Sequence, residues 1–376
     1  MRLRWSPGRL ARAARAGLGM AIGMLVYPIA WFGWFRPRDR LADAVAQLLL
    51  VGFYGANPSS PSARLLARQV RRGQVGGIFF VSQNIGSTEE VTALLRLFRA
   101  GGAKPLLAID HEGGVVQRLG EAHGFTRLPS AREVATSLTI AEARELYAIA
   151  GRELAALGFT VNLGPVVDVD DPDNEAIGVF GRAYDTEPDR IAAYAEAFVD
   201  GFAEAGITCV VKHFPGHGRA AGDSHHGPAD ISTTWAEEEL EPFARLIDAG
   251  RAPVVMTGHL RLDAIAPDGA PATISSAIVG GLLRGRLGYR GVIATDDLDM
   301  GAVSRILGRK QAVVQAIRAG NDLLMIKNLF GYDPLMPQRA VGWVRAAITR
   351  GILTEQHVID AADRVRSIRR VGKASS

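Results

Sequence analysis

After residue 45, short apolar runs rich in β-branched residues alternate with longer segments in which apolar residues recur at helical spacing. Short continuous runs of this kind are typical of strands that are buried on both faces. Such strands belong to parallel sheets, because the connecting helices cover both faces of the sheet. The eight predicted strands are Gln47–Phe53, Val75–Val81, Pro105–Asp110, Phe159–Leu163, Ile207–Lys212, Pro253–Thr257, Gly291–Thr295 and Asp322–Ile326.

The longer segments carry signals for the start and the end of helices. Three capping boxes are predicted, at Ser87 with Glu90, Thr139 with Glu142, and Thr234 with Glu237. Glycines suited to end helices stand before the following strands, at Gly101, Gly158, Gly206, Gly250, Gly288 and Gly320. The last segment, Thr354–Arg370, has the pattern of a terminal amphipathic helix. Eight strand and helix units predict a single (β/α)₈ barrel, with an open doubly wound sheet as the alternative.

Polar residues that gather at the ends of the predicted strands favour the barrel over the open sheet. They are Asp110, Asn162, Asp168, Lys212, His213, Thr257, His259, Asp296 and Asp297. A barrel brings all eight strand ends onto one face, where the chemistry of such barrels takes place. An open sheet would leave many of these residues far apart. We therefore predict one domain, residues 41–376, with its site at the carboxyl ends of the strands.

The positive charge of the chain is concentrated before this domain. Residues 1–40 hold eight arginines and one acidic residue, so the remainder is mildly acidic although the whole chain carries +4. This distribution argues against a nucleic-acid partner for the folded part. After five arginines, Ala16–Phe35 contains twenty residues without a charge, about the length of a membrane-spanning helix. We predict a basic tail and a hydrophobic membrane anchor in residues 1–40, with a cleaved signal peptide as the alternative.

The segment from Lys212 to Asp230, KHFPGHGRAAGDSHHGPAD, holds four of the eight histidines. Its glycines and prolines predict a long, mobile loop over the barrel mouth, and long loops of this kind usually have a function. Within it, Asp223 stands two residues before His225. A carboxylate can orient an imidazole ring, and a histidine pKa of about 6.5 suits a group that donates and then accepts a proton.

Two other strand ends carry candidate groups. Asp296 and Asp297 follow one predicted strand, and because successive strand side chains point in opposite directions, only one carboxylate is expected to face the barrel axis. That carboxylate could ligate a metal or act as a nucleophile. Asp110 ends another strand and is a candidate acceptor for ligand hydroxyl groups. Arg118 and Arg182 are candidate donors to polar or anionic groups.

At these stretches the chain resembles the single-domain β-N-acetylhexosaminidases of glycoside hydrolase family 3, of the type that recycles peptidoglycan. AIDHEGGVVQR is similar to the D-x-E-G-G-R-V-Q-R segment of that family, KHFPGHGRAAGDSHHGP to its K-H-F-P-G-H-G…D-S-H loop, and ATDDLDM to its nucleophile segment. The likeness continues through PATISSAIVGGLLRGRLGYRGVIATDD. It departs at Val115, where the family usually has arginine, and at Pro228-Ala229, where it has Leu-Pro. Both departures concern the aglycone preference more than the reaction.

The resemblance implies a (β/α)₈ barrel and a retaining double displacement. Asp296 is then the nucleophile that forms a glycosyl-enzyme, and His225, paired with Asp223, is the acid/base. The positions that match sugar-binding residues of the family are Asp110, Arg118, Arg182, Lys212 and His213. The implied function is an exo-acting β-N-acetylglucosaminidase that hydrolyses terminal GlcNAc from peptidoglycan fragments or related glycans, without a metal or another cofactor.

Other functions stay open from the residues themselves. A metal-dependent hydrolase on the same barrel could use His213, His217, His225, Asp223 and Asp296 as a binuclear centre. A family 3 enzyme with another sugar preference, a phosphorolytic enzyme and a catalytically silent glycan-binding protein are further alternatives. The arginines before the predicted anchor favour an N-terminus in the cytoplasm, which predicts a catalytic domain on the periplasmic side of a bacterial inner membrane, with the cytoplasm as the alternative.

Overall fold

The computed structural model describes residues 39–222, 229–329 and 331–371. The predicted hydrophobic segment Ala16–Phe35 lies outside the described residues, and so do Asp223 and His225. Within the described part of the chain, no helix is long and apolar enough to cross a membrane. The membrane anchor therefore stays a prediction. The chain divides into residues 1–40 and residues 41–376, and the following description concerns the second unit.

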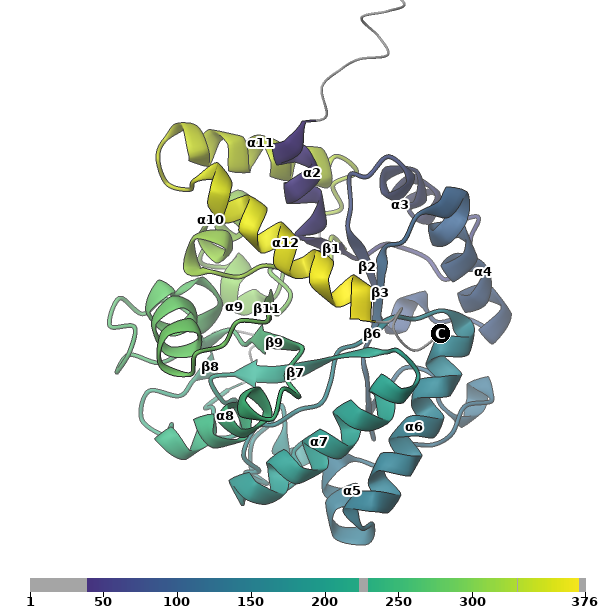
Figure 1. Cartoon of the computed structure of the whole chain (residues 1–376), viewed down its shortest axis with the longest axis vertical. Helices are drawn as coiled ribbons and strands as arrows, with labels where there is room; N and C mark the ends of the chain where they lie inside the picture. Colours follow the sequence, from purple (N-terminus) through teal and green to yellow (C-terminus); the bar gives the residue numbers. More distant parts are fainter. Residues whose placement is uncertain (1–38, 223–228, 330, 372–376) are drawn as a thin grey trace, which may run out of the picture. The chain divides into compact units, whose positions relative to one another are not determined.

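Eight parallel strands form the centre of the fold (Figure 1). Their order is β11 (Val292–Thr295), β9 (Val254–Thr257), β7 (Thr208–Phe214), β6 (Val161–Asn162), β3 (Leu106–Ile109), β2 (Gly77–Phe80), β1 (Leu49–Val51) and β12 (Leu324–Ile326). A parallel bridge between Ala294 and Leu323 brings the two ends of this order together, so the barrel is nearly closed. All eight predicted strands are confirmed, with β7 continuing two residues beyond its predicted end, and the open sheet is excluded.

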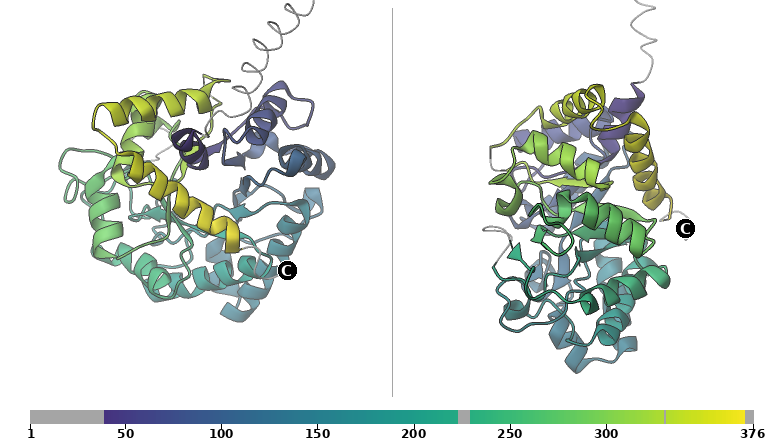
Figure 2. Two further views of the ribbon diagram at one scale, coloured as in Figure 1. Left: turned by 45° about the horizontal axis from the view of Figure 1, so that its top comes forward. Right: turned by 90° about the vertical axis from the view of Figure 1, so that its left-hand side faces the viewer.

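Helices surround this barrel (Figure 2). The α-helices are α2 (Arg40–Gln47), α3 (Pro61–Arg71), α4 (Thr88–Arg99), α5 (Ala131–Ser137), α6 (Ile140–Leu157), α7 (Pro188–Glu204), α8 (Glu241–Asp248), α9 (Gly301–Ser304), α10 (Arg309–Ala319), α11 (Met336–Thr349) and α12 (Glu355–Val371). A π-helix spans Ala277–Arg286, and the short helices are Ser82–Asn84, Ala100–Gly102, Glu121–His123, Gly178–Phe180, Glu237–Leu240 and Ala272–Ile274. The extra strands are β4 (His111–Gly113), β5 (Val116–Gln117), β8 (Ala229–Asp230) and β10 (Leu260–Arg261).

Two of the three predicted capping boxes are confirmed. Ser87 and Thr139 each accept the backbone N–H of the glutamate three residues on, at the starts of α4 and α6. The box predicted at Thr234 is wrong. The Thr234 hydroxyl donates to the carbonyl of Arg219, and Glu237 pairs with Arg286 instead. The Thr234 hydroxyl therefore binds the loop after β7, whereas the local pattern predicted that it would cap a helix.

Side chains that point into the barrel form an apolar core of their own. It contains Leu50, Phe79, Leu106, Ala108, Val161, Leu163, Val210, Val254, Met256, Val292, Ala294, Leu323 and Met325. Val365 and Ile368 of α12 belong to the same core, and Arg369 donates to the carbonyl of Gly76, just before β2. Helix α12 therefore covers the amino ends of the strands, crossing the barrel in Figure 1. The predicted site residues follow the opposite, carboxyl ends.

Candidate active site

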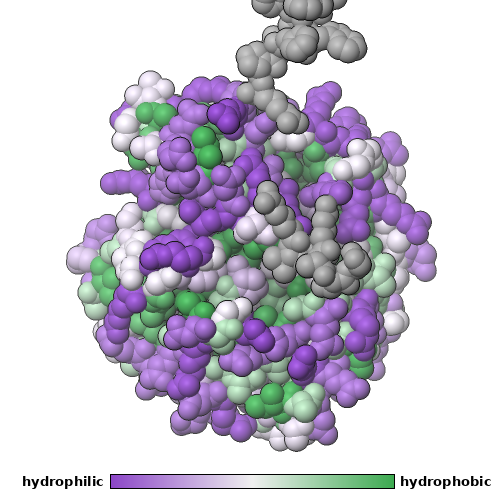
Figure 3. Space-filling view, in the orientation of Figure 1, coloured by the Kyte–Doolittle hydropathy of each residue, from purple (hydrophilic) through white to green (hydrophobic). Residues whose placement is uncertain are grey.

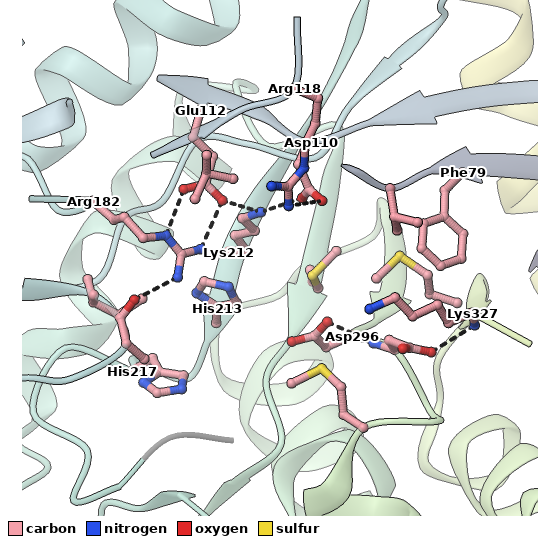
Figure 4. A pocket seen from close by; sticks show the side chains of 18 residues that line it. Phe79, Asp110, Glu112, Arg118, Arg182, Lys212, His213, His217, Asp296 and Lys327 are labelled. Carbon is pink, nitrogen blue, oxygen red and sulfur yellow. Dashed lines mark hydrogen bonds and ion pairs between the residues drawn. The ribbon is translucent and has the colours of Figure 1, made fainter. Parts of the chain in front are cut away.

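A pocket of about 160 Å³ lies at the carboxyl ends of the strands (Figure 4). Its lining includes Phe79, Met256 and Met325, which also belong to the core inside the barrel and form an apolar base. Six predicted site residues line the pocket together: Asp110, Arg118, Arg182, Lys212, His213 and Asp296. The remaining two predicted residues, Asp223 and His225, lie outside the described residues. The barrel thus gathers side chains that are far apart along the chain.

The turn after β3 is held by a buried amide from the neighbouring strand. Asn162 of β6 is fully buried, and its Nδ2 donates to the carbonyl of His111 at 2.9 Å. Its Oδ1 accepts the backbone N–H of His111 at 3.0 Å. Beyond this turn, a Cβ on Gly113 would lie 2.3 Å from the carbonyl oxygen of Pro129, so only glycine fits there. These contacts fix the segment that carries Asp110 and Glu112.

Glu112 is bound by two cations in the wall of the pocket. Arg182 donates to it twice, from Nε to Oε2 at 2.8 Å and from Nη2 to Oε1 at 2.9 Å. The Nζ of Lys212 lies 2.6 Å from Oε1. Burial alone would raise the pKa of Glu112, but the charges of Arg182 and Lys212 outweigh it and hold that pKa well below its ordinary value. Glu112 therefore stays ionised at neutral pH.

Asp110 connects this buried group to the open part of the pocket. Its Oδ1 lies 3.2 Å from Nζ of Lys212, and its Oδ2 lies 3.2 Å from Nη2 of Arg118. Burial would lower the pKa of Lys212, but Glu112 and Asp110 together raise it. The side chains of Asp110 and Arg118 are 20% and 24% exposed, whereas that of Lys212 is 4% exposed. The network thus offers fixed charged donors and acceptors, which suit hydrogen bonds to the hydroxyl groups of a polar ligand.

A buried carboxylate orients the first histidine of the site. Oδ2 of Asp168 lies 2.8 Å from Nδ1 of His213, and its Oδ1 accepts the backbone N–H groups of His213 and His217. Burial alone would raise the pKa of Asp168, but the charge and the hydrogen bond of His213 lower it. An ionised Asp168 keeps the hydrogen of the ring on Nδ1. Nε2 of His213 is then the ring nitrogen that can bind a ligand.

The two adjacent carboxylates after β11 have different surroundings. The N–H of Asp296 donates to the carbonyl of Thr257 at 3.0 Å, and its side chain points into the pocket in Figure 4. Asp297 is 5% exposed, and its Oδ1 accepts the backbone N–H groups of Asp299 and Lys327. Burial raises the pKa of Asp297 to about 7. Asp296 is thus the carboxylate placed to meet a ligand, and Asp297 holds the neighbouring backbone.

Glu239 is a second unusual carboxyl group, behind the loop that follows β7. It is 1% exposed, and neither of its oxygens has a hydrogen-bond partner among the described residues. It packs against Gly216, where an added Cβ would lie 2.4 Å from Oε2. Burial and the nearby charge of Asp168 raise the pKa of Glu239 to about 8. A neutral acid at physiological pH is therefore part of the support of this loop.

We expect Glu239 to make the protein less stable as the pH rises from about 4.5 to about 8. An unfolded glutamate loses its proton near the lower value, whereas Glu239 in the folded protein keeps it, so the folded state binds more protons in this interval. The substitution Glu239→Gln should flatten this part of the Tm–pH curve. Glu241→Gln, at an exposed position close by, is the control and should keep the wild-type slope. An unchanged slope for Glu239→Gln would contradict the expectation.

Two of the five residues of the metal-dependent alternative, Asp223 and His225, lie outside the described residues. Among the described residues, no group of three or more His, Cys, Asp and Glu side chains is arranged to hold a metal ion. His213, His217 and Asp296 line one pocket.

Comparisons with known proteins identify the family. The sequence model described as "Glycosyl hydrolase family 3 N terminal domain" matches residues 40–368. The chain belongs to glycosyl hydrolase family 3. A curated relative, "Beta-hexosaminidase LpqI" of Mycobacterium tuberculosis, is 38% identical over 306 residues, which cover 77% of this chain and 72% of the relative. This family 3 chain is a glycoside hydrolase, as the sequence motifs predicted.

Solved structures of similar proteins have the same fold. A β-N-acetylglucosaminidase from Paenibacillus sp. superposes with a TM-score of 0.79 at 33% identity, covering 89% of this chain. The family 3 chain spans 63% of the length of that protein, which is less than two thirds. A β-N-acetylhexosaminidase from Beutenbergia cavernae superposes with a TM-score of 0.76 at 32% identity, covering 88% of this chain and 98% of the other.

The sequence motifs indicate no role for two side chains that hold groups of this family 3 site in place. Glu112 stands inside the AIDHEGGVVQR segment, but its partners Arg182 and Lys212 are distant in the chain, so only the fold shows the pairing. Asp168 was recognised as a polar residue at a strand end without a role. A buried carboxylate there becomes informative once His213 is known to lie beside it.

Proposed function

We propose that this family 3 enzyme is an exo-acting β-N-acetylglucosaminidase that removes terminal GlcNAc from peptidoglycan fragments or related glycans, with retention of configuration. The observation that carries the proposal is a single pocket in which Asp296 shares the lining with the charged network of Asp110, Arg182 and Lys212. The sugar is supported by the names of the relatives, a β-hexosaminidase and a β-N-acetylglucosaminidase.

In this proposal the charged network holds the non-reducing sugar. Asp110 accepts hydrogen bonds from sugar hydroxyl groups, while Arg118 and Lys212 donate to them. His213 contributes Nε2, because Asp168 occupies Nδ1. The apolar base of the pocket gives the faces and the methyl group of GlcNAc a surface to pack against. These contacts orient C1 of the sugar toward Asp296, and orientation of this kind accounts for a large share of enzymatic rate enhancement.

The proposed reaction has two steps. An oxygen of Asp296 attacks C1 from the α face, the bond between C1 and the leaving oxygen breaks, and His225 protonates that oxygen. The products are an α-linked glycosyl-aspartate and the free aglycone. His225 then removes a proton from water, the water oxygen attacks C1, and β-GlcNAc leaves Asp296 free. Asp223 orients the His225 ring, a role that both residues receive from the resemblance of the D-S-H segment to the family.

The closed base of the pocket supports an exo mode of action. Its base is the apolar core of the barrel, and α12 covers the far end of that core. A sugar in the middle of a glycan would need room on both of its sides, whereas a terminal sugar needs an opening on one side. The enzyme is therefore proposed to release single sugars from chain ends.

The stereochemistry of the product tests the proposal. We expect p-nitrophenyl β-GlcNAc to be hydrolysed and the β anomer of GlcNAc to appear first by NMR. A 2-fluoro sugar with a good leaving group should label the peptide that contains Asp296, as measured by mass spectrometry. Initial release of the α anomer would contradict the retaining mechanism. GlcNAc 1-phosphate as the main product in phosphate buffer would favour the phosphorolytic alternative.

A further inference from the structure

Lys327 differs from the other basic side chains that line the pocket. Arg118, Arg182 and Lys212 each form an ion pair with Asp110 or Glu112. Within the described part of the chain, Lys327 has no ion pair, although four carboxylates line the same pocket. A partly buried ammonium group without a counter-ion has lost part of its hydration and gains from an anionic ligand.

The backbone of Lys327 is held in place while its side chain extends into the pocket. Its N–H donates to Oδ1 of Asp297 at 2.8 Å, and the N–H of Asn328 donates to Oδ2 of Asp299 at 2.8 Å. On the other side, a Cβ on Gly52 would lie 2.4 Å from the carbonyl oxygen of Lys327, so the chain of β1 packs closely there. Figure 4 shows the Lys327 side chain on the Asp296 side of the pocket.

The strand order places Lys327 across the barrel mouth from the charged network. Lys327 directly follows β12, and Arg182 lies in the connection that leaves β6. These two strands are separated by three others in either direction around the eight-membered ring, so their ends are opposite each other. Asp296 follows β11, the neighbour of β12. A ligand that spans the mouth therefore meets the network first, then Asp296, and then Lys327.

We propose that Lys327 is a specificity residue that binds a carboxylate on the leaving saccharide. The assignment rests on the proposed function, in which the network holds the terminal sugar and Asp296 attacks C1. The sugar beyond C1 then lies on the Lys327 side. In peptidoglycan that sugar is N-acetylmuramic acid, whose lactyl ether on O3 adjoins the glycosidic oxygen on O4. Its carboxylate is an anion close to the scissile bond.

Three disaccharides separate the effect of the charge on the lactyl carboxylate from the other effects of the leaving sugar. They are GlcNAc-β-1,4-MurNAc with a free lactyl carboxylate, its lactyl methyl amide, and chitobiose, which lacks the lactyl ether. The measured quantity is kcat/KM for each substrate in wild type and in the variants Lys327→Arg, Lys327→Gln and Lys327→Glu. We expect the ratio of the acid to the amide to fall about tenfold in Lys327→Gln, to fall further in Lys327→Glu, and to be largely kept in Lys327→Arg.

The control is Lys310→Gln, which removes an exposed lysine from α10 and should leave the ratio unchanged. A lower ratio in high salt for the wild type, but not for Lys327→Gln, would support the assignment further. Equal losses on the acid, the amide and chitobiose would overturn it and show that Lys327 acts on Asp296 or on the terminal sugar. An unchanged ratio would also overturn it. A wild type without turnover on all three substrates would overturn the proposed function as well.

Discussion

Replacing Asp296 by alanine is expected to lower kcat by about four orders of magnitude on p-nitrophenyl β-GlcNAc. The proposed first step forms a covalent bond between C1 and an oxygen of this residue, so no neighbouring group in the pocket performs the same task. Asp297 is buried and accepts two backbone N–H groups, which keeps it from replacing Asp296. Steady-state kinetics with an aryl glycoside measure the loss.

Chemical rescue separates a lost nucleophile from a damaged pocket. In Asp296→Ala, azide should enter the vacated space, attack C1 from the α face and produce the α-glycosyl azide of GlcNAc. The isosteric variant Asp296→Asn should be equally inactive, but with little room for azide. Both variants are expected to unfold at nearly the wild-type denaturant concentration, because Asp296 is partly exposed. Turnover close to wild type in Asp296→Ala would refute the assignment.

The second large effect is expected on stability, from Glu112→Ala. This change leaves Arg182 and Lys212 buried beside each other without their shared carboxylate. Removing one partner from a buried ion pair typically costs about 3–5 kcal/mol, because the remaining charge is uncompensated. We expect a decrease of this size in the free energy of unfolding measured in urea. Glu112→Gln, which keeps the acceptor but removes the charge, should lie between the wild type and Glu112→Ala.

A matched control is available on the surface of the same domain. Glu204 also accepts hydrogen bonds from Nε and Nη2 of an arginine, Arg144, with Nη2 2.8 Å from Oε1. The side chain of Glu204 is 43% exposed and that of Arg144 is 52% exposed. An exposed pair of this kind is worth about 0–1 kcal/mol. Glu204→Ala should therefore cost much less than Glu112→Ala. Similar losses in both variants would contradict the importance of burial.

The surface of the domain agrees with this division between buried and exposed charges. The space-filling view in Figure 3 shows hydrophilic residues over most of the visible face, with smaller hydrophobic areas between them. The pairs that hold the pocket, by contrast, have side chains that are 4% to 12% exposed, at Glu112, Lys212 and Arg182. Charge thus has two different physical roles in this protein, and only the buried groups are expected to affect folding strongly.

Much of the fold could be predicted from the sequence because its signals are local. The eight apolar runs, the capping boxes at Ser87 and Thr139 and the glycine at Gly158 act over a few residues and are found where they were expected. The failure at Thr234 has a physical reason as well. Its hydroxyl is taken by the carbonyl of Arg219, fifteen residues away, and a local pattern contains no information about that partner.

The candidate site was predictable in part for the same reason. Residues at strand ends, such as Asp110 and Asp296, could be placed together because a barrel fixes where strand ends meet. The partners of Glu112 could not, because Arg182 is 70 residues away and the contact depends on the course of a loop. The sequence also could not show that Lys327 has no ion pair among the described residues. That depends on how the fold places Lys327 relative to the carboxylates of the pocket, and no local motif indicates it.

The position of α12 has a consequence for the order of events in catalysis. Because α12 covers the amino ends of the strands, the substrate and products of the proposed reaction are expected to pass through the carboxyl ends of the barrel. In the proposed reaction, the aglycone is expected to depart before water reaches C1, and the monosaccharide is expected to diffuse out before the next chain end binds. Accumulated GlcNAc is consequently expected to inhibit the enzyme by competing with the substrate for the pocket. The enzyme is also expected to release the glycan after every cleavage.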